Sequence, residues 1–320
     1  MIAVIFPGQG VQVPGMGLAL ARAYPATAGA VFATADRVLG FRLSRLIDSG
    51  DQRLLSRTEI TQPALLAASL AAWHALLAEL PRLRPSFAAG LSLGEYTALV
   101  AAGAIDTDSA FRLISWRGRY TEDASAEHAG GMCAVLGLER DIVEDLCRET
   151  RAGKAGGVWV ANLNAPGQTV ISGQAPAVQE AATRAAARGG RVVPLKVGGA
   201  FHCPLMAGAS RRLSLLLEAA PWRTPSFPVY SNATGRPYPG AASIAQGLVA
   251  QMTSPVLWED IVRDMASRGA RVFLELGPGK TLASLVGRIL PEATVLGVSD
   301  PASLARAAEA LGDYALEVVS

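Results

Sequence analysis

Two residues far apart in the chain have the side chains that a nucleophile and its base require. Ser92 lies between two glycines in Gly-Leu-Ser-Leu-Gly, residues 90–94, where an apolar strand-like run gives way to a helix-like segment. His202 follows in a second Gly-rich stretch, residues 197–206. A serine is a weak nucleophile unless a base accepts its proton, and an imidazole can do so near neutral pH. The pair predicts acyl-transfer chemistry if the fold brings the two side chains together.

The pentapeptide around Ser92 has two interpretations. Between a strand and a helix, a G-x-S-x-G sequence can form a nucleophile elbow, a strained turn that lifts the serine hydroxyl out of the sheet. It can equally form an ordinary Gly-rich turn, and the five residues alone do not decide. In an elbow, the main-chain N–H groups of Leu93 and of the glycine-flanked Gln9 would hold the oxyanion of an acyl-transfer intermediate.

The other candidate residues have structural interpretations. His202 taken alone fits a packed or surface histidine, and we interpret His74, in an apolar helix, and His128, in a polar linker, in that way. Cys203 is expected to be a small buried residue. The three cysteines are odd in number and widely spaced, which argues against a disulfide framework and a zinc site and favours a reducing cytoplasm.

Composition excludes some classes of protein. The 320 residues carry 29 Lys and Arg against 27 Asp and Glu, far from the basic excess of a nucleic-acid binder. The apolar run at residues 2–6 is too short for a secretion signal, so we assign no meaning to the sequon at 232–234. Residues 61–78 carry no charge and approach the length of a membrane span, but we expect a helix buried in an α/β core.

Two Gly-rich loops imitate nucleotide-binding motifs. Gly8-Gln9-Gly10 follows a strand-like run, but the third glycine of a dinucleotide fingerprint would fall at Val13. The segment 276–281 imitates the end of a Walker A loop, but the first glycine of that motif would fall at Leu274. Both spacings argue against a nucleotide site.

The order of apolar runs predicts an α/β fold. Short strand-like runs alternate with longer helical patterns, which is typical of a mostly parallel sheet covered by helices. The order of Ser before His agrees with an α/β-hydrolase-like topology. The predicted strands are residues 2–6, 86–90, 272–277 and 293–298, and helical segments are predicted at residues 16–39, 62–79 and 95–121.

The alternation of strand-like and helical segments changes in the middle of the chain, over residues 129–197. This stretch has the β-α-β-β-α-β order of a ferredoxin-like unit. We expect a large α/β-hydrolase-like domain, residues 1–128 and 198–320, with an inserted ferredoxin-like subdomain, residues 129–197, and a ligand site in the cleft between them. The predicted elements of the insert are strands 132–138, 158–163, 168–172 and 191–197, helices 139–150 and 176–188, and a hairpin turn at 164–167.

Several segments together resemble a known family. They are similar to the malonyl-CoA:acyl-carrier-protein transacylases and the related acyltransferases of polyketide synthases, and they run nearly end to end. The whole set is highly specific, whereas G-x-S-x-G alone is not. The matching segments are 6–12 (FPGQGVQ), 61–66 (TQPALL), 90–99 (GLSLGEYTAL), 117–118 (RG), 162–173 (NLNAPGQTVISG), 198–206 (GGAFHCPLM), 231–235 (SNATG), 253–260 (TSPVLWED) and 276–280 (LGPGK).

The resemblance implies a ping-pong mechanism through an acyl-serine. Ser92 would take a malonyl group from coenzyme A and pass it to the phosphopantetheine thiol of an acyl carrier protein, with His202 as the base. The amides of Gln9 and Leu93 would form the oxyanion hole. Family members orient the histidine through a main-chain carbonyl instead of a carboxylate, and the match places that carbonyl at Gln251.

The resemblance also assigns substrate contacts. Arg117 matches the arginine that pairs with the free carboxylate of a malonyl-type group, although without the resemblance we would interpret it as a solvated residue on a helix at 110–121. Gln62 falls in a matching segment and is expected to bind substrate. Phe201 matches the pattern associated with unbranched malonyl, where a smaller residue accompanies methylmalonyl. Leu91 departs from the family, which often has histidine there, so acyl preference or hydrolysis could differ.

We therefore expect a cytoplasmic, monomeric transacylase of fatty acid or polyketide synthesis, with no cofactor and with a coenzyme A thioester as substrate. Its partners would be malonyl-CoA and an acyl carrier protein, with no nucleic acid, membrane or metal. The alternatives are an acyl hydrolase that clears carrier proteins, an acyltransferase for another carboxyacyl unit, and a non-catalytic docking module.

Three basic residues could face an acidic carrier protein: Arg184, Arg188 and Arg191. We prefer to interpret them as residues of a solvated helix face.

Overall fold

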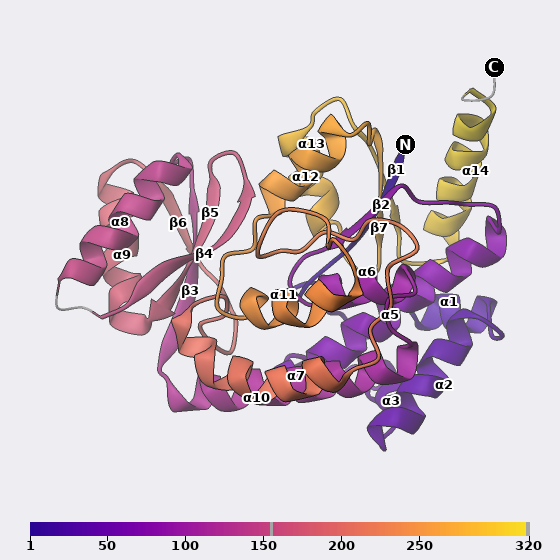
Figure 1. Ribbon diagram of the computed structural model, residues 1–320, viewed down its shortest axis with the longest axis horizontal. Helices are drawn as coiled ribbons and strands as arrows, with labels where there is room; N and C mark the ends of the chain where they lie inside the picture. Colours follow the sequence, from indigo (N-terminus) through magenta and orange to yellow (C-terminus); the bar gives the residue numbers. More distant parts are fainter. Residues whose placement is uncertain (154–155, 318–320) are drawn as a thin grey trace.

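Two separate β-sheets organise the chain (Figure 1). The computed structural model describes residues 1–153 and 156–317. The strands of the first sheet are β1 (Ile2–Phe6), β2 (Phe87–Gly90), β7 (Val272–Leu276) and β8 (Thr294–Val298). Those of the second are β3 (Gly130–Leu136), β4 (Val158–Ala165), β5 (Gln168–Gln174) and β6 (Arg191–Pro194). The first sheet has the order β2-β1-β7-β8 with parallel pairs, and the second has the order β4-β5-β3-β6 with antiparallel pairs.

Helices occupy most of the chain between the strands. In Figure 1 the antiparallel sheet lies at one end of the molecule with α8 (Arg140–Ala152) and α9 (Ala175–Ala187), away from α14 (Pro301–Glu317). The other helices are α1 (Leu18–Ala23), α2 (Ala28–Leu39), α3 (Leu43–Asp48), α4 (Gln52–Leu55), α5 (Thr58–Glu79), α6 (Gly94–Ala101), α7 (Thr107–Glu127), α10 (Ala207–Ala219), α11 (Ile244–Gln251), α12 (Trp258–Ser267) and α13 (Thr281–Ile289).

The central strand β1 is buried on both faces, which is why it reads as one apolar run. Val4 and Phe6 belong to the core that includes side chains of α2, α5 and α7. Ala3 and Ile5 belong to the opposite core, which includes side chains of α12 and α13. The predicted α/β fold with a parallel sheet is confirmed, and its two cores lie on the two faces of that sheet.

The predicted helical segment at residues 16–39 is wrong as a single helix. Helix α1 ends at Ala23 and α2 begins at Ala28. Pro25 lies in the break, where its missing N–H and its ring prevent an α-helix from continuing. The apolar pattern continued across the break because both helices pack on the same core.

The uncharged stretch at residues 61–78 lies inside α5, which begins at Thr58 and is buried along most of its length. It is long and apolar enough to cross a membrane, but 83% of its apolar window is buried inside the protein. A core helix meets the same length and composition test, so this test alone is weak evidence for a membrane span. The expected buried core helix is present.

The antiparallel sheet has the predicted order of elements, β3-α8-β4-β5-α9-β6. Helices α8 and α9 pack on one face, in a core that includes Val135, Leu146 and Ala181. The other face carries a small apolar cluster of its own, which includes Met132 and Val170. Strand β6 is shorter than predicted, since it ends at Pro194, although the N–H of Leu195 still donates to the Met132 carbonyl at 3.0 Å.

Strand β4 ties the second sheet to the rest of the chain. The N–H of Leu163 donates to the Val256 carbonyl at 2.9 Å, and the N–H of Val256 donates to the Ala161 carbonyl at 2.8 Å. These main-chain hydrogen bonds extend the edge of the antiparallel sheet with the segment between α11 and α12. They attach the antiparallel sheet to the segment at Val256, which leads into α12.

Candidate active site

The segment around Ser92 is a tight turn between β2 and α6. Ser92 has a positive φ of 53°, which is uncommon for a residue with a Cβ. A Cβ on Gly90 would lie 1.9 Å from the carbonyl carbon of Gly94, and a Cβ on Gly94 would lie 2.1 Å from the main-chain oxygen of Phe6. Both glycines are therefore required by close backbone approach. The strained strand-to-helix geometry is that of a nucleophile elbow and not of an ordinary turn.

Two side-chain amides hold the peptide groups of Ser92. Its N–H donates to Asn232 Oδ1 at 2.6 Å, and its carbonyl accepts from Gln251 Nε2 at 2.9 Å. Asn232 Nδ2 also donates to the carbonyl of Gly90 at 2.7 Å. A residue in a sparsely populated backbone region persists only when its surroundings fix it, and these hydrogen bonds do so here.

The fold brings Ser92 and His202 into hydrogen-bond contact. His202 Nε2 lies 2.8 Å from Ser92 Oγ, and His202 Nδ1 lies 2.9 Å from the main-chain oxygen of Gln251. A carbonyl oxygen can only accept, so Nδ1 carries the proton and Nε2 offers its lone pair to the serine hydroxyl. His202 is buried and also has a positive φ, 57°. The predicted contact with the Gln251 carbonyl is present.

Arg117 is buried, so the interpretation of a solvated arginine is wrong. Only 4% of the residue is exposed, and its Nη2 donates to Ser92 Oγ at 3.0 Å. Nη1 donates to Gln62 Oε1 at 2.8 Å, and Nη2 also donates to Gln251 Oε1 at 3.1 Å. Gln62 Nε2 in turn donates to Gln9 Oε1 at 3.0 Å. Neutral amides therefore fix a buried cation beside the hydroxyl of Ser92.

A cavity of about 300 Å³ lies in front of these residues, between the two sheets. Its polar wall includes Ser92, Arg117 and His202, and Phe201 lies beside the histidine. Its opposite wall comes from the apolar face of the antiparallel sheet. The other lining residues are Gly8, Gln9, Gly10, Val11, Leu91, Met132, Ala134, Asn162, Asn164, Gln168, Val170, Leu195, Val197 and Thr281. The expected cleft between the two parts of the chain is thus present.

Three predicted site residues do not line this cavity, and one of them, Gln251, contacts His202 and Arg117 instead. Gln62 is fully buried behind Arg117, where it contacts the guanidinium. Leu93 packs its side chain into the core. Among residues 1–153 and 156–317, no acceptor is found for the N–H of Leu93 or for that of Gln9. Both donors are therefore available to a ligand oxygen.

Three residues of the site were not identified from the sequence. Asn232 belongs to a sequon to which we assigned no meaning, yet it is fully buried and holds the elbow. Glu95 and Tyr238 are joined by a short buried hydrogen bond next to it. A carboxylate in the apolar helix after Ser92 was the one visible signal for Glu95. Cys203 is buried as expected, and its thiol donates to the Ala200 carbonyl at 3.2 Å.

Comparison with known proteins identifies the class to which this chain belongs. Residues 4–313 match the family model described as acyl transferase domain, so the class of protein is an acyltransferase. The malonyl CoA-acyl carrier protein transacylase of Haemophilus influenzae is 39% identical over 94% of this chain and 96% of its own. That of Bacillus subtilis is 38% identical over 97% of both.

Solved structures give the same result. A malonyl CoA-acyl carrier protein transacylase from Clostridium perfringens, 33% identical, superposes with a TM-score of 0.94 over 100% of this chain and 99% of its own. A malonyl-transacylase in complex with its type II PKS acyl-carrier protein is 39% identical, with a TM-score of 0.92 over 96% and 99%. The chain belongs to the malonyl CoA-acyl carrier protein transacylase family.

The site predicts an unusual pH dependence. Burial lowers the pKa of His202 from 6.5 to about 4, against the opposing effect of the Gln251 carbonyl. The neutral imidazole that accepts a proton from Ser92 therefore persists well below neutral pH. We expect the rate at which a fluorophosphonate labels Ser92 to stay level from about pH 7 to about pH 5 and to fall toward about pH 4. A fall centred near the ordinary histidine pKa would contradict this account.

Proposed function

We propose that this protein transfers a malonyl group from malonyl-CoA to the phosphopantetheine thiol of an acyl carrier protein. The observation that carries the proposal is the buried guanidinium of Arg117, 3.0 Å from Ser92 Oγ at the edge of the cavity. A buried cation next to a nucleophile favours an acyl group that carries its own negative charge. The pathway that we propose for it is fatty acid or polyketide synthesis.

The transfer proceeds in two half-reactions. Ser92 Oγ attacks the thioester carbonyl while its proton moves to His202 Nε2. The carbon–sulfur bond then breaks, and the departing coenzyme A thiolate takes that proton and leaves as the free thiol. The carrier-protein thiol then attacks the malonyl ester, gives its proton to the same nitrogen, and Ser92 regains it. The N–H groups of Gln9 and Leu93 stabilise the oxyanion in each step. The Gln251 carbonyl keeps the histidine in the required tautomer.

Arg117 orients the acyl group in this scheme. A guanidinium binds a carboxylate with two parallel hydrogen bonds, which places the malonyl carbonyl over Ser92. Gln62 and Gln251 accept hydrogen bonds from the guanidinium and so fix its plane. We therefore assign Gln62 to the support of Arg117 and not to direct contact with the acyl group.

The two parts of the chain share the site. We assign residues 1–128 and 198–320 to an α/β-hydrolase-like domain that supplies nucleophile, base and arginine. Residues 129–197 form an inserted ferredoxin-like subdomain that closes the cavity with the apolar face of its sheet. The strand order β4-β5-β3-β6 supports this assignment of the insert. Leu91 lines the cavity in place of the histidine common in the family, and its effect on acyl preference is part of this proposal.

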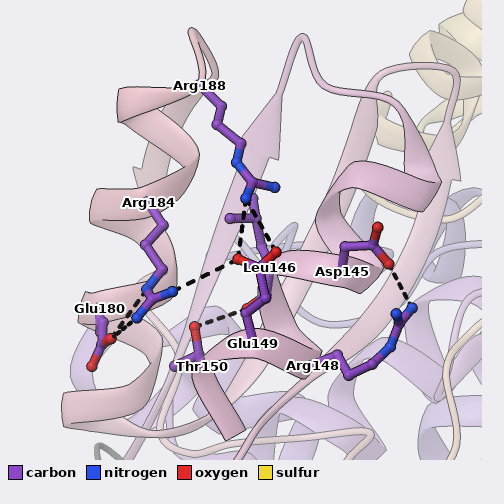
Figure 2. A network of polar contacts seen from close by, with 8 residues as sticks. All are labelled: Asp145, Leu146, Arg148, Glu149, Thr150, Glu180, Arg184 and Arg188. Carbon is purple, nitrogen blue, oxygen red and sulfur yellow. Dashed lines mark hydrogen bonds and ion pairs between the residues drawn. The ribbon is translucent and has the colours of Figure 1, made fainter. Parts of the chain in front are cut away.

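The basic residues of α9 do not support a carrier-binding site. Figure 2 shows Arg184 between Glu180 and Glu149. A guanidinium nitrogen of Arg184 lies 2.5 Å from a carboxylate oxygen of Glu180, and another lies 3.7 Å from one of Glu149. Arg188 contacts Glu149 at 3.1 Å. Their charges are balanced within the antiparallel sheet's own helices, which supports the preferred interpretation of a solvated helix face. Arg191 begins strand β6, so the helix-face interpretation is wrong for this residue, and we propose that it is a solvated residue of that exposed strand end.

We further propose a cytoplasmic monomer that needs no metal or redox cofactor and binds no nucleic acid or membrane. The chemistry requires only a nucleophile, a base and an activated thioester. The three cysteines are buried as free thiols, which fits a reducing compartment. An acyl hydrolase is less well supported, because neutral acyl groups would not compensate the buried charge of Arg117. The intact contact between Ser92 and His202 is evidence against a docking module.

Replacement of Arg117 tests the proposed substrate. Removing one partner of a buried ion pair costs about 3–5 kcal/mol, so Arg117→Ala should lower kcat/KM for malonyl-CoA by about two to three orders of magnitude. Turnover of acetyl-CoA should be unchanged or improved. The exposed Arg119 on the same helix gives a matched control, and Arg119→Ala should leave both rates unchanged. An equal loss for both substrates in Arg117→Ala would make this arginine structural and remove the support for malonyl.

Phe201 tests the width of the acyl pocket. One methyl group in an apolar pocket is worth about 1–3 kcal/mol, so malonyl-CoA should exceed methylmalonyl-CoA by about 10–200-fold in kcat/KM. Phe201→Ala should reduce this preference toward unity. Val170→Ala enlarges the same cavity from strand β5 and should keep the preference. Equal rates for the two substrates in the unmodified protein would show that Phe201 does not exclude the branch.

A further inference from the structure

Glu95 is a buried carboxylate that the mechanism above does not use. It lies in the first turn of α6, three residues after Ser92, and is 0% exposed. It does not line the cavity. The partners of its carboxylate are Gln251, Asn232 and Tyr238, and neither the Ser92 hydroxyl nor the His202 ring is among them. Its main-chain N–H donates to the Ser92 carbonyl at 3.1 Å, a bond that a change of side chain would keep. The carboxylate therefore contacts residues that support Ser92 and His202, and not the reacting atoms.

Its partners are the residues that hold the nucleophile and the base. Glu95 Oε2 accepts from Gln251 Nε2 at 2.7 Å and from the N–H of Asn232 at 3.0 Å. Gln251 supplies the carbonyl that binds His202, and its side-chain amide also holds the carbonyl of Ser92. The side chain of Asn232 holds the N–H of Ser92. One carboxylate oxygen thus connects both residues that fix the catalytic pair.

The second oxygen of the carboxylate is held from the opposite side. Glu95 Oε1 accepts from the hydroxyl of Tyr238, a residue of the loop before α11. With three donors, the carboxylate has few ways to move or rotate. Since Gln251 and Asn232 come from separate segments of the chain, Glu95 sets the distance between them.

We propose that Glu95 is a positioning residue that keeps Ser92 and His202 in register by hydrogen bonds to Gln251 and Asn232. The inference rests on the proposed roles of Ser92 and His202. The positioning of Ser92 and His202 depends on the shape and hydrogen-bonding capacity of the Glu95 side chain and not on its negative charge.

The surroundings of Glu95 support a role independent of charge. Burial raises the pKa of Glu95 to about 7, against the hydrogen bonds of Tyr238, Gln251 and Asn232 and the charge of Arg117. A proton on Oε1 would leave both hydrogen bonds at Oε2 intact, because a tyrosine hydroxyl can accept as well as donate. Either protonation state therefore holds Gln251 and Asn232 in the same positions.

Substitutions at position 95 separate shape from charge. Glu95→Gln keeps the length, since its amide oxygen can accept from Gln251 and Asn232 while its NH₂ donates to Tyr238. Glu95→Asp keeps the charge but is one methylene too short. We expect labelling of Ser92 by a fluorophosphonate to slow by about 100-fold in Glu95→Ala and Glu95→Asp, and to stay within a few-fold of the unmodified rate in Glu95→Gln.

A second buried glutamate provides the control for general loss of stability. Glu275 accepts from the N–H groups of Leu282 at 3.1 Å and Ala283 at 2.8 Å. Within the part of the chain that the structure describes, its side chain forms no hydrogen bond with Asn232 or Gln251, which hold Ser92. Glu275→Ala should lower the melting temperature without slowing the labelling. Melting temperatures of all variants, measured alongside the rates, separate lost stability from lost positioning.

The possible outcomes distinguish this inference from the assignment of the nucleophile. Labelling that persists in Ser92→Ala would overturn that assignment and, with it, the inference. If Ser92 is labelled, a rate in Glu95→Ala equal to the unmodified rate would overturn the inference alone. Where Glu95→Ala does not fold, the order of the other two variants decides. A Glu95→Asp rate equal to or above that of Glu95→Gln would show that charge matters more than shape.

Discussion

The left-handed backbone of Ser92 is the constraint on which the rest of the site depends. Such a conformation costs on the order of 1–3 kcal/mol, and here hydrogen bonds to both peptide groups of the residue offset it. The same geometry explains the glycines at 90 and 94, because the chain must pass close to itself and to β1. It also explains why two distant segments, which carry Asn232 and Gln251, both form hydrogen bonds with the main chain of Ser92.

The distribution of charge follows from burial. Arg117 is the buried cation of the site, and His202 is held neutral by desolvation. A carboxylate in contact with the imidazole would favour its charged form and would compete with a substrate carboxylate for the guanidinium. A main-chain carbonyl orients His202 without either effect. The buried acid that is present, Glu95, is separated from Arg117 by the side-chain amide of Gln251.

Local sequence patterns predicted most of the fold. The chemistry of serine and histidine side chains, together with the family resemblance, predicted the pairing of Ser92 with His202. Apolar runs located both sheets because strand periodicity and helix periodicity differ, whereas the break at Pro25 was missed because the helices on its two sides share a core. The supports of the site could not be predicted in the same way. Asn232 and Glu95 act through partners more than a hundred positions away in the chain, and no local pattern encodes such contacts.

The most direct test of the central claim is the mass of the intact protein after incubation with malonyl-CoA in the absence of a carrier protein. The account predicts a single malonyl adduct that disappears in Ser92→Ala and is discharged when a holo acyl carrier protein is added. His202→Ala should form the adduct far more slowly, because loss of either member of a nucleophile–base unit costs on the order of 10⁶ in kcat. An adduct that persists in Ser92→Ala would contradict the account.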